Sequence, residues 1–250
     1  MLLKLIACNV FMREACACIA QSPHIIDVEF TELGEHIHPE GLRATLQGKI
    51  DAASQSVKGY DAILLLFGLC GNAGVGLQAR QVPLVMPRAH DCCTILLGSR
   101  EAFKEHFGPN PSMPFSSVGY LERGDYYLRT EQDGEATMHF GDAYAALVEE
   151  YGEEDARYIW ETMHPTLPGA EQHQVVFIDL PETAHLGYAE QFHAKAEADG
   201  KACLPLPGNI RLINGLICGE WQPADYLTVP PGHQTSGVYD FEEILRAVKV

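Results

Sequence analysis

One continuous apolar run limits the fold of this chain more than any other feature. Within residues 60–71, YDAILLLFGLCG, six consecutive aliphatic and aromatic residues run from Ala62 to Phe67, and the segment ends in glycine. A strand buried on both faces has this pattern, and such strands occur in parallel sheets that helices cover on both sides. Because parallel strands need crossover connections, the flanking segments must supply helices. The run therefore predicts an α/β fold.

The segments around this run repeat the strand–helix alternation through residue 107. Further strands are expected at residues 2–10, 25–33 and 82–87. Helices are expected from near Phe11, over residues 38–56 with Pro39 in the first turn, and over residues 99–107 with Ser99 as N-cap. Another helix is expected after the glycine-rich segment that follows Cys70. This order predicts a doubly wound, mostly parallel, Rossmann-like sheet.

The rest of the chain suggests a second α/β lobe joined by a crossover. Residues 1–107 form the predicted N-terminal lobe, and residues 108–172 a loop-rich and helical crossover with a helical pair at 141–163. Residues 173–250 form the predicted C-terminal lobe, packed on the first. It has strands at 174–180, 202–208 and 226–232 and helices at 188–200 and 210–219. Two such lobes would leave a cleft between them.

The charge balance narrows the classes of partner. Acidic residues number 34 and basic residues 17, which gives a formal charge of -17. This balance argues against nucleic acids and anionic membrane surfaces, which both need clustered Lys and Arg. No apolar run reaches the roughly 18 residues of a membrane-spanning helix, and MLLKLIAC is too short for a secretory signal. We therefore expect a cytoplasmic protein with a small-molecule or protein partner.

Cysteines and a histidine follow the ends of three predicted strands. Cys8 ends the first strand, Cys70 ends the third, and His90 and Cys92 follow the fourth. Ligands of parallel α/β sheets bind beyond the carboxyl ends of the strands. Cys8, Cys70, His90 and Cys92 would form a Cys3His set, which suits tetrahedral zinc. An iron–sulfur cluster could instead take the three thiolates.

Neighbouring residues are candidates for supporting roles. Arg88 could lower thiol pKa values or bind an anionic substrate, and Asp91 could orient His90 or carry a proton. Glu14, early in the first helix, could point into the same cleft. The structural alternative is a buried thiol pair with an Arg–Asp salt bridge that shapes a turn, and a metal-free reactive cysteine is a third reading.

The glycine-rich segment after Cys70 is a candidate anion or cofactor cradle. Gly71, Asn72 and Gly74 could turn backbone N–H groups toward a phosphate or carboxylate. The segment matches neither nucleotide-binding glycine motif and lacks the P-loop lysine, which argues against nucleotide hydrolysis. Glycines that permit close packing of loops explain it equally well.

Several motifs together resemble the domain-of-unknown-function family 1638. They are ACNVFMRE, FGLCGN, PRAHDCCTILLGS, YGEEDARYIWETM and CGEWQPADYLTVPPG, spread over most of the chain. The resemblance implies an accessory protein of one-carbon metabolism that occurs with corrinoid-dependent methyltransferases. The positions carried over are Cys8, Glu14, Cys70, Asn72, Arg88, His90, Asp91 and Cys92. The segment YYLRTEQDGEA departs from the family by lacking a tryptophan, which implies a different ligand or lid.

These observations lead to three functional hypotheses. The first is a zinc-binding protein of one-carbon metabolism, an enzyme or accessory factor of corrinoid-dependent methyl transfer, because zinc methyltransferases also use a His-x-Cys pair like His90-x-Cys92. The second is a non-catalytic iron–sulfur or corrinoid-handling protein that docks on a methyltransferase. Corrinoid ranks below the other cofactors, because His36 replaces the aspartate of the corrinoid signature. The third is a metal-free, racemase-like enzyme with Cys8 and a second thiol as acid and base. A homodimer is left open.

Overall fold

A five-stranded sheet forms the centre of the protein. The computed structural model describes residues 1–32, 39–111, 113–123, 174–238 and 243–250. The strand order is β2–β1–β3–β4–β8, in which only β8 runs antiparallel to its neighbour β4. The strands are β1 (Leu2–Cys8), β2 (Ile25–Thr31), β3 (Ala62–Leu66), β4 (Leu84–Pro87) and β8 (Tyr226–Val229). The predicted mixed α/β fold with a mostly parallel sheet is confirmed.

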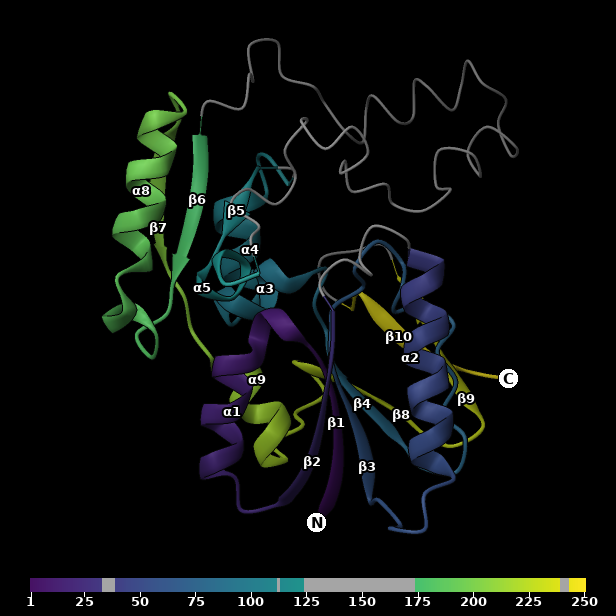
Figure 1. Ribbon diagram of the computed structural model, residues 1–250. Helices are drawn as coiled ribbons and strands as arrows, with labels where there is room; N and C mark the ends of the chain where they lie inside the picture. The colour runs from purple at the N-terminus through teal and green to yellow at the C-terminus, as the bar shows by residue number, and fades with distance from the viewer. Residues whose placement is uncertain (33–38, 112, 124–173, 239–242) are drawn as a thin grey trace, which may run out of the picture.

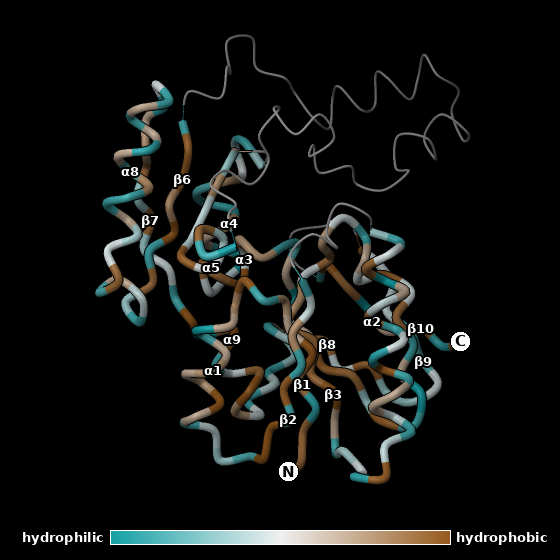
Figure 2. Tube along the Cα trace, in the orientation of Figure 1, coloured by the Kyte–Doolittle hydropathy of each residue, from teal (hydrophilic) through white to brown (hydrophobic). Residues whose placement is uncertain are grey.

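The apolar run that predicted this fold is the middle strand of the sheet. Every residue of β3 is buried, and β1 and β4 are buried beside it. Figure 2 shows the hydrophobic colour concentrated on these strands, while α2 (Pro39–Ser54) alternates between hydrophobic and hydrophilic residues. A strand covered on both faces buries all its side chains, whereas a covering helix buries one stripe.

Helices cover the sheet on both faces. α1 (Met12–Gln21) and α9 (Arg211–Cys218) pack together on one face, and α2 lies on the other (Figure 1). As predicted, Pro39 lies in the first turn of α2, and Ser99 caps α4 (Arg100–Phe107) by accepting a hydrogen bond from the Ala102 N–H at 3.1 Å. Within the described residues, no helix has the length and apolarity needed to cross a membrane.

The helix expected after the glycine-rich segment is absent, and this prediction was wrong. Residues 67–83 contain turns and no helix. A hairpin of β9 (His233–Gly237) and β10 (Leu245–Lys249) covers them instead. The Gly76 N–H bonds the Thr235 carbonyl at 2.9 Å, and the Leu77 N–H bonds the Thr235 hydroxyl at 2.9 Å. The backbone groups of this connection are therefore satisfied by a distant part of the chain, which local periodicity does not reveal.

A second, three-stranded parallel sheet stands apart from the first. Its order is β5–β6–β7, from β5 (Phe115–Ser116), β6 (Gln174–Asp179) and β7 (Ala202–Pro207). α8 (Tyr188–Ala198) packs on it, and the short helices α5 (Val118–Leu121) and η4 (Ala184–Leu186) border it. β5 lies in the segment expected to be a crossover, and β8 returns to the first sheet. The predicted helical pair at 141–163 lies outside the described residues.

The carboxyl ends of the two sheets face each other. β1 runs upward from the N-terminus in Figure 1, while β6 points downward. The turn after β1, η1 (Asn9–Phe11), packs against α5, which follows β5. A Cβ atom on Gly119 would lie 1.8 Å from the Val10 carbonyl oxygen. Glycine at this position therefore allows α5 to contact the end of the first sheet directly.

The Gly119→Ala substitution should destabilise the protein, because the added methyl group must displace backbone. We expect a loss of about 2 kcal/mol or more in the free energy of unfolding, measured by urea denaturation. Gly48→Ala is the matched control: Gly48 lies inside α2 with no atom within 4 Å of its added Cβ. It should stabilise the protein by about 0.5 to 1 kcal/mol. Equal effects of the two substitutions would contradict the close packing of α5 on η1.

Candidate functional site: a thiol cluster at the edge of the central sheet

The candidate site lies where the order of strand addition reverses, between β1 and β3. The chain passes from β1 through α1 to β2 on one side, and from β2 through α2 to β3 on the other side of β1. The carboxyl ends of β1 and β3 therefore border a topological switch point, where open α/β sheets bind their ligands. Cys8 is the last residue of β1, and Cys70 lies four residues beyond β3.

Backbone hydrogen bonds continue beyond the ends of β3 and β4 and hold two loops together. The Leu69 N–H donates to the Ala89 carbonyl at 2.9 Å, and the Cys70 N–H donates to the His90 carbonyl at 3.0 Å. A Cβ on Gly68 would lie 2.7 Å from the Asp91 nitrogen, so only glycine permits this approach. α3 (Cys92–Leu97), a helix that we did not predict, begins directly after this contact.

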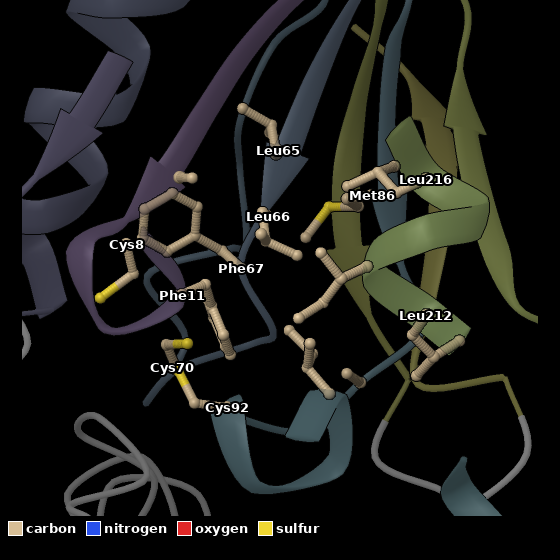
Figure 3. Packing of buried hydrophobic residues seen from close by; sticks show 14 of the residues in the cluster. Cys8, Phe11, Leu65, Leu66, Phe67, Cys70, Met86, Cys92, Leu212 and Leu216 are labelled. Atoms are coloured by element: carbon tan, nitrogen blue, oxygen red, sulfur yellow. The ribbon is translucent and has the colours of Figure 1, made fainter. Parts of the chain in front are cut away.

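Three thiols from three loops meet at this edge. The Cys92 thiol is the side-chain hydrogen-bond partner of both Cys8 and Cys70. Figure 3 shows the three side chains at the end of β1, after β3 and at the start of α3, with the Cys70 and Cys92 sulfurs next to each other. Cys8, Cys92 and Cys70 are 0, 3 and 9% exposed. The bonds to Cys92 and burial raise the pKa of Cys8 and of Cys70, so both thiols keep their protons at neutral pH.

The loop that carries Cys70 has an unusual backbone. Cys70, Gly71 and Asn72 have φ angles of 45, 63 and 70°, which makes three successive left-handed residues. A non-glycine residue in this region costs roughly 1 to 2 kcal/mol, and such strain gathers at functional sites. Arg43 from α2 holds the Asn72 carbonyl at 2.8 Å, and the Gly74 N–H donates to the Leu69 carbonyl at 3.0 Å. The Gly74 N–H is therefore used within the loop and does not support the predicted binding of an anion at this position.

Two residues of the site were missed by sequence reasoning. Tyr120 on α5 is 1% exposed, and its hydroxyl hydrogen-bonds with the Cys92 thiol. Burial, more than its thiol neighbours, raises the pKa of Tyr120, so the hydroxyl stays protonated. Arg123, three residues later, donates to the Asn9 carbonyl at 3.1 Å. Its charge opposes the rise in the pKa of Cys8 that Cys92 and burial cause. Neither residue belongs to a sequence motif, so proximity in the fold is the only signal.

Asp91 and His90, two further predicted site residues, make contacts that stabilise α3 and its packing. The Asp91 carboxylate caps α3 by accepting from the Thr94 N–H at 3.1 Å and lies near the Thr94 hydroxyl at 3.3 Å. The His90 ring packs against Phe103 with 5.7 Å between ring centroids. Among the described residues, no group of three or more His, Cys, Asp or Glu side chains is arranged to hold a metal ion. The Cys3His metal set therefore stays a prediction.

Arg88 lies against the C-terminal segment of the chain. Its Nε donates to the Pro223 carbonyl at 2.9 Å and its Nη1 to the Glu243 carbonyl at 2.7 Å. The Leu245 carbonyl also accepts from Nη1. These bonds tie the loop before β8 and the start of β10 to the end of β4, a structural role that gives no support to anion binding by Arg88.

Glu14 belongs to a different cluster. It is 2% exposed, and its Oε2 has no hydrogen-bond partner among residues 1–32, 39–111, 113–123, 174–238 and 243–250. Burial, with smaller contributions from Glu122 and Glu182, raises the pKa of Glu14 to about 7. The groups that act on this carboxyl come from α1, the end of α5 and the loop after β6. The structure thus places Glu14 among carboxylates where α1 meets the second sheet.

A surface cavity of about 350 Å³ lies elsewhere, on the second sheet. α8 and the strands β6 and β7 line it, with His193 and Cys203 among the lining residues. Burial raises the pKa of Cys203, so its environment does not activate the thiol. The thiol cluster at the central sheet remains the stronger candidate site.

Comparison with known proteins gives a family without an assigned activity. A family model described as "Protein of unknown function (DUF1638)" matches residues 30–217. This range includes Cys70, Cys92, Tyr120 and Arg123, and Cys8 lies before it. No curated protein matches the chain, and no solved structure matches it.

The Glu14→Gln substitution should stabilise the protein at high pH only. The folded pKa, about 7, lies above the ordinary value of 4.5, so the folded protein holds this proton more tightly and loses stability as pH rises from 4.5 through 7. Glutamine cannot ionise. We expect the variant to be more stable than the natural protein by up to about 3 kcal/mol at pH 8 and by less than about 1 kcal/mol at pH 5, measured by urea unfolding.

Glu105→Gln is the control for this prediction, because Glu105 is exposed on α4. It should change stability little at either pH. A gain for Glu14→Gln that is the same at both pH values would show that Glu14 is not held protonated by burial.

Proposed function

Because this chain belongs to the DUF1638 family, whose description names no activity, we propose its function from the thiol cluster. Cys8, Cys70 and Cys92 bind a thiophilic metal ion, with zinc as the first candidate. The bound ion serves methyl-group transfer in one-carbon metabolism, in an enzyme or an accessory factor of corrinoid-dependent methyltransferases. His90, two residues before Cys92, is the proposed fourth ligand.

One observation carries this proposal: three buried thiols from three separate loops lie at the switch point of a parallel sheet. Random burial of cysteine as a small apolar residue does not require thiols to contact one another. Here Cys92 contacts both other thiols, and the loop of Cys70 adopts a strained backbone to present it. The cost of that conformation is easiest to explain if the thiols act together.

The donor type suits a thiophilic ion, because zinc prefers thiolate sulfur, but the three side chains of the described structure are not arranged around one ion. Sulfur ligands of a tetrahedral zinc site, at about 2.3 Å from the metal, lie about 3.8 Å from one another. Cys92 is the hydrogen-bond neighbour of both other thiols, and binding an ion would require the side chains to shift until all three sulfurs surround it. When bound, zinc lowers the pKa of a coordinated thiol and makes a thiolate available at neutral pH.

The residues of the chain supply the surroundings for this chemistry. The protonated Tyr120 hydroxyl contacts Cys92 from the side of α5, and aromatic side chains, including Phe11 and Phe67 in Figure 3, close the site toward the core. Cys70 is the most exposed of the three thiols. A reactant would therefore approach on the side of Cys70. The facing edges of the two sheets support the idea of a two-lobed, Rossmann-like protein with its reaction site between the lobes.

The second candidate is an iron–sulfur protein, because the three thiols could hold a cluster without His90. The racemase-like alternative has less support. Such an enzyme needs the substrate carbon between its two cysteines, whereas Cys8 and Cys92 contact each other directly. All eight cysteines are free, which agrees with a reducing compartment and with our proposal of a cytoplasmic protein.

Removing any one thiol of the cluster should reduce the metal content. We expect protein purified without oxygen to hold about one zinc per chain, and Cys8→Ser, Cys70→Ser and Cys92→Ser to lose most of it in elemental analysis. Cys18→Ser is the control, because Cys18 is a buried thiol on α1 outside the cluster. It should keep its metal. Unfolding curves establish that each variant is folded.

The outcomes separate the candidates. Zinc in a colourless protein favours methyl transfer, whereas iron with broad visible absorbance favours the cluster protein. Full metal retention in folded Cys70→Ser and Cys92→Ser variants, or a natural protein without metal, would refute the proposed site.

A further inference from the structure

Positive charge is scarce in this protein, and about half of the Lys and Arg side chains that the structure describes form close ion pairs with carboxylates. The chain has 17 basic and 34 acidic residues. Many of the basic residues form ion pairs of 2.5 to 3.0 Å with Asp or Glu: Lys4, Arg13, Lys49, Lys58, Arg80, Lys195, Arg211 and Arg246. A cation beside the proposed site that lacks such a pair is therefore a candidate for binding an anionic ligand.

Arg123 is such a cation. Its shortest ion-pair distance within the described residues is 3.8 Å, from Nη1 to the Glu122 carboxylate, and that carboxylate is held by Arg13 at 2.6 Å. The Arg123 side chain is only 22% exposed. Its Nη2 donates to the Asn9 carbonyl at 3.1 Å and contacts the Met12 sulfur at 3.4 Å. One edge of the guanidinium is thus fixed to the loop after Cys8, while no described carboxylate lies closer to it than 3.8 Å.

A second buried polar group lies beside it. The Asn9 side chain is 5% exposed, and its Nδ2 donates to Glu32 at 3.1 Å. The Asn9 Oδ1 is buried and has no hydrogen-bond partner within the part of the chain that the structure describes. A buried acceptor left without a donor destabilises the folded protein. Among the described residues, a guanidinium without a close counterion and an amide oxygen without a donor therefore flank Cys8.

We infer that Arg123 is the anion-binding residue of the thiol cluster and selects a reactant that carries a carboxylate or phosphate group. This inference rests on the proposed function, because it takes the thiol cluster as the reaction site. A guanidinium forks onto either oxyanion with two parallel N–H bonds. The Asn9 Oδ1 accepts an N–H or O–H of the same reactant. Arg88, the earlier candidate for this role, is bonded to three backbone carbonyls.

The test compares an anionic and a neutral reagent of nearly the same size. Iodoacetate and iodoacetamide both alkylate thiolates: the sulfur bonds the CH2 carbon, iodide leaves, and the thiol proton passes to buffer. Peptide mass spectrometry gives the rate at each cysteine, in protein as purified and after removal of metal by a chelator. Exposed Cys16 serves as the internal standard.

We expect the ratio of iodoacetate to iodoacetamide rates at the cluster to exceed the ratio at Cys16 by about tenfold, the factor for one charge-assisted bond. Arg123→Gln should abolish this excess. Arg100→Gln is the control, because Arg100 also donates to a backbone carbonyl, that of Ala224 at 2.8 Å, but far along the chain on α4. Added acetate or inorganic phosphate, at equal ionic strength, should slow iodoacetate, and the stronger competitor identifies the class of anion.

Three results would overturn the inference. They are a ratio at the cluster no higher than at Cys16, an excess that survives in Arg123→Gln, and no alkylation of the cluster while Cys16 reacts completely. Metal content measured on the same samples keeps the two proposals apart. Metal without anion preference refutes the role of Arg123 alone, and anion preference without metal refutes the metal site alone.

Discussion

The site depends on two hydrogen bonds that extend a strand pairing past the ends of its strands. β3 and β4 pair over a short register, yet their loops stay joined through Leu69 with Ala89 and Cys70 with His90. Gly68 permits this approach, because any side chain would strike the backbone at Asp91. Without this extension, nothing would hold the loop of Cys70 beside the start of α3, and the thiols would remain separate buried cysteines.

The same constraint explains the unusual connection between these two strands. A parallel pair normally joins through a helix on one face of the sheet. Here the first part of residues 67–83 pairs with the loop after β4. The second part contacts the β9–β10 hairpin, in which Thr235 accepts hydrogen bonds from the Gly76 and Leu77 N–H groups. Arg88 fastens the start of β10 to the end of β4. The C-terminal segment thus replaces the missing helix and leaves the carboxyl edge of the sheet open for the thiols.

The sequence was sufficient for the elements with strong periodicity. The buried run at β3, the amphipathic pattern of α2 and the Ser99 cap of α4 each reflect a local physical preference, and the structure contains all three. The rule that ligands gather at strand ends was enough to select Cys8, Cys70 and Cys92 as neighbours. α3 and the β9–β10 hairpin were missed, because the first is a single short apolar stretch and the second is stabilised by contacts with a distant loop.

The candidate site also contains residues that no local pattern could assign. Tyr120 and Arg123 reach the thiols only because Gly119 lets α5 press against the Val10 carbonyl, a contact between elements that follow different sheets. Arg88 and Asp91 belong to the PRAHDCC motif, yet Arg88 donates to backbone carbonyls and Asp91 caps a helix. In an acidic chain, an arginine near a thiol is informative only once its counterions are known. The proximity of Arg88 to His90 in sequence therefore carried less information than the 3.8 Å that separates Arg123 from the nearest carboxylate in the described structure.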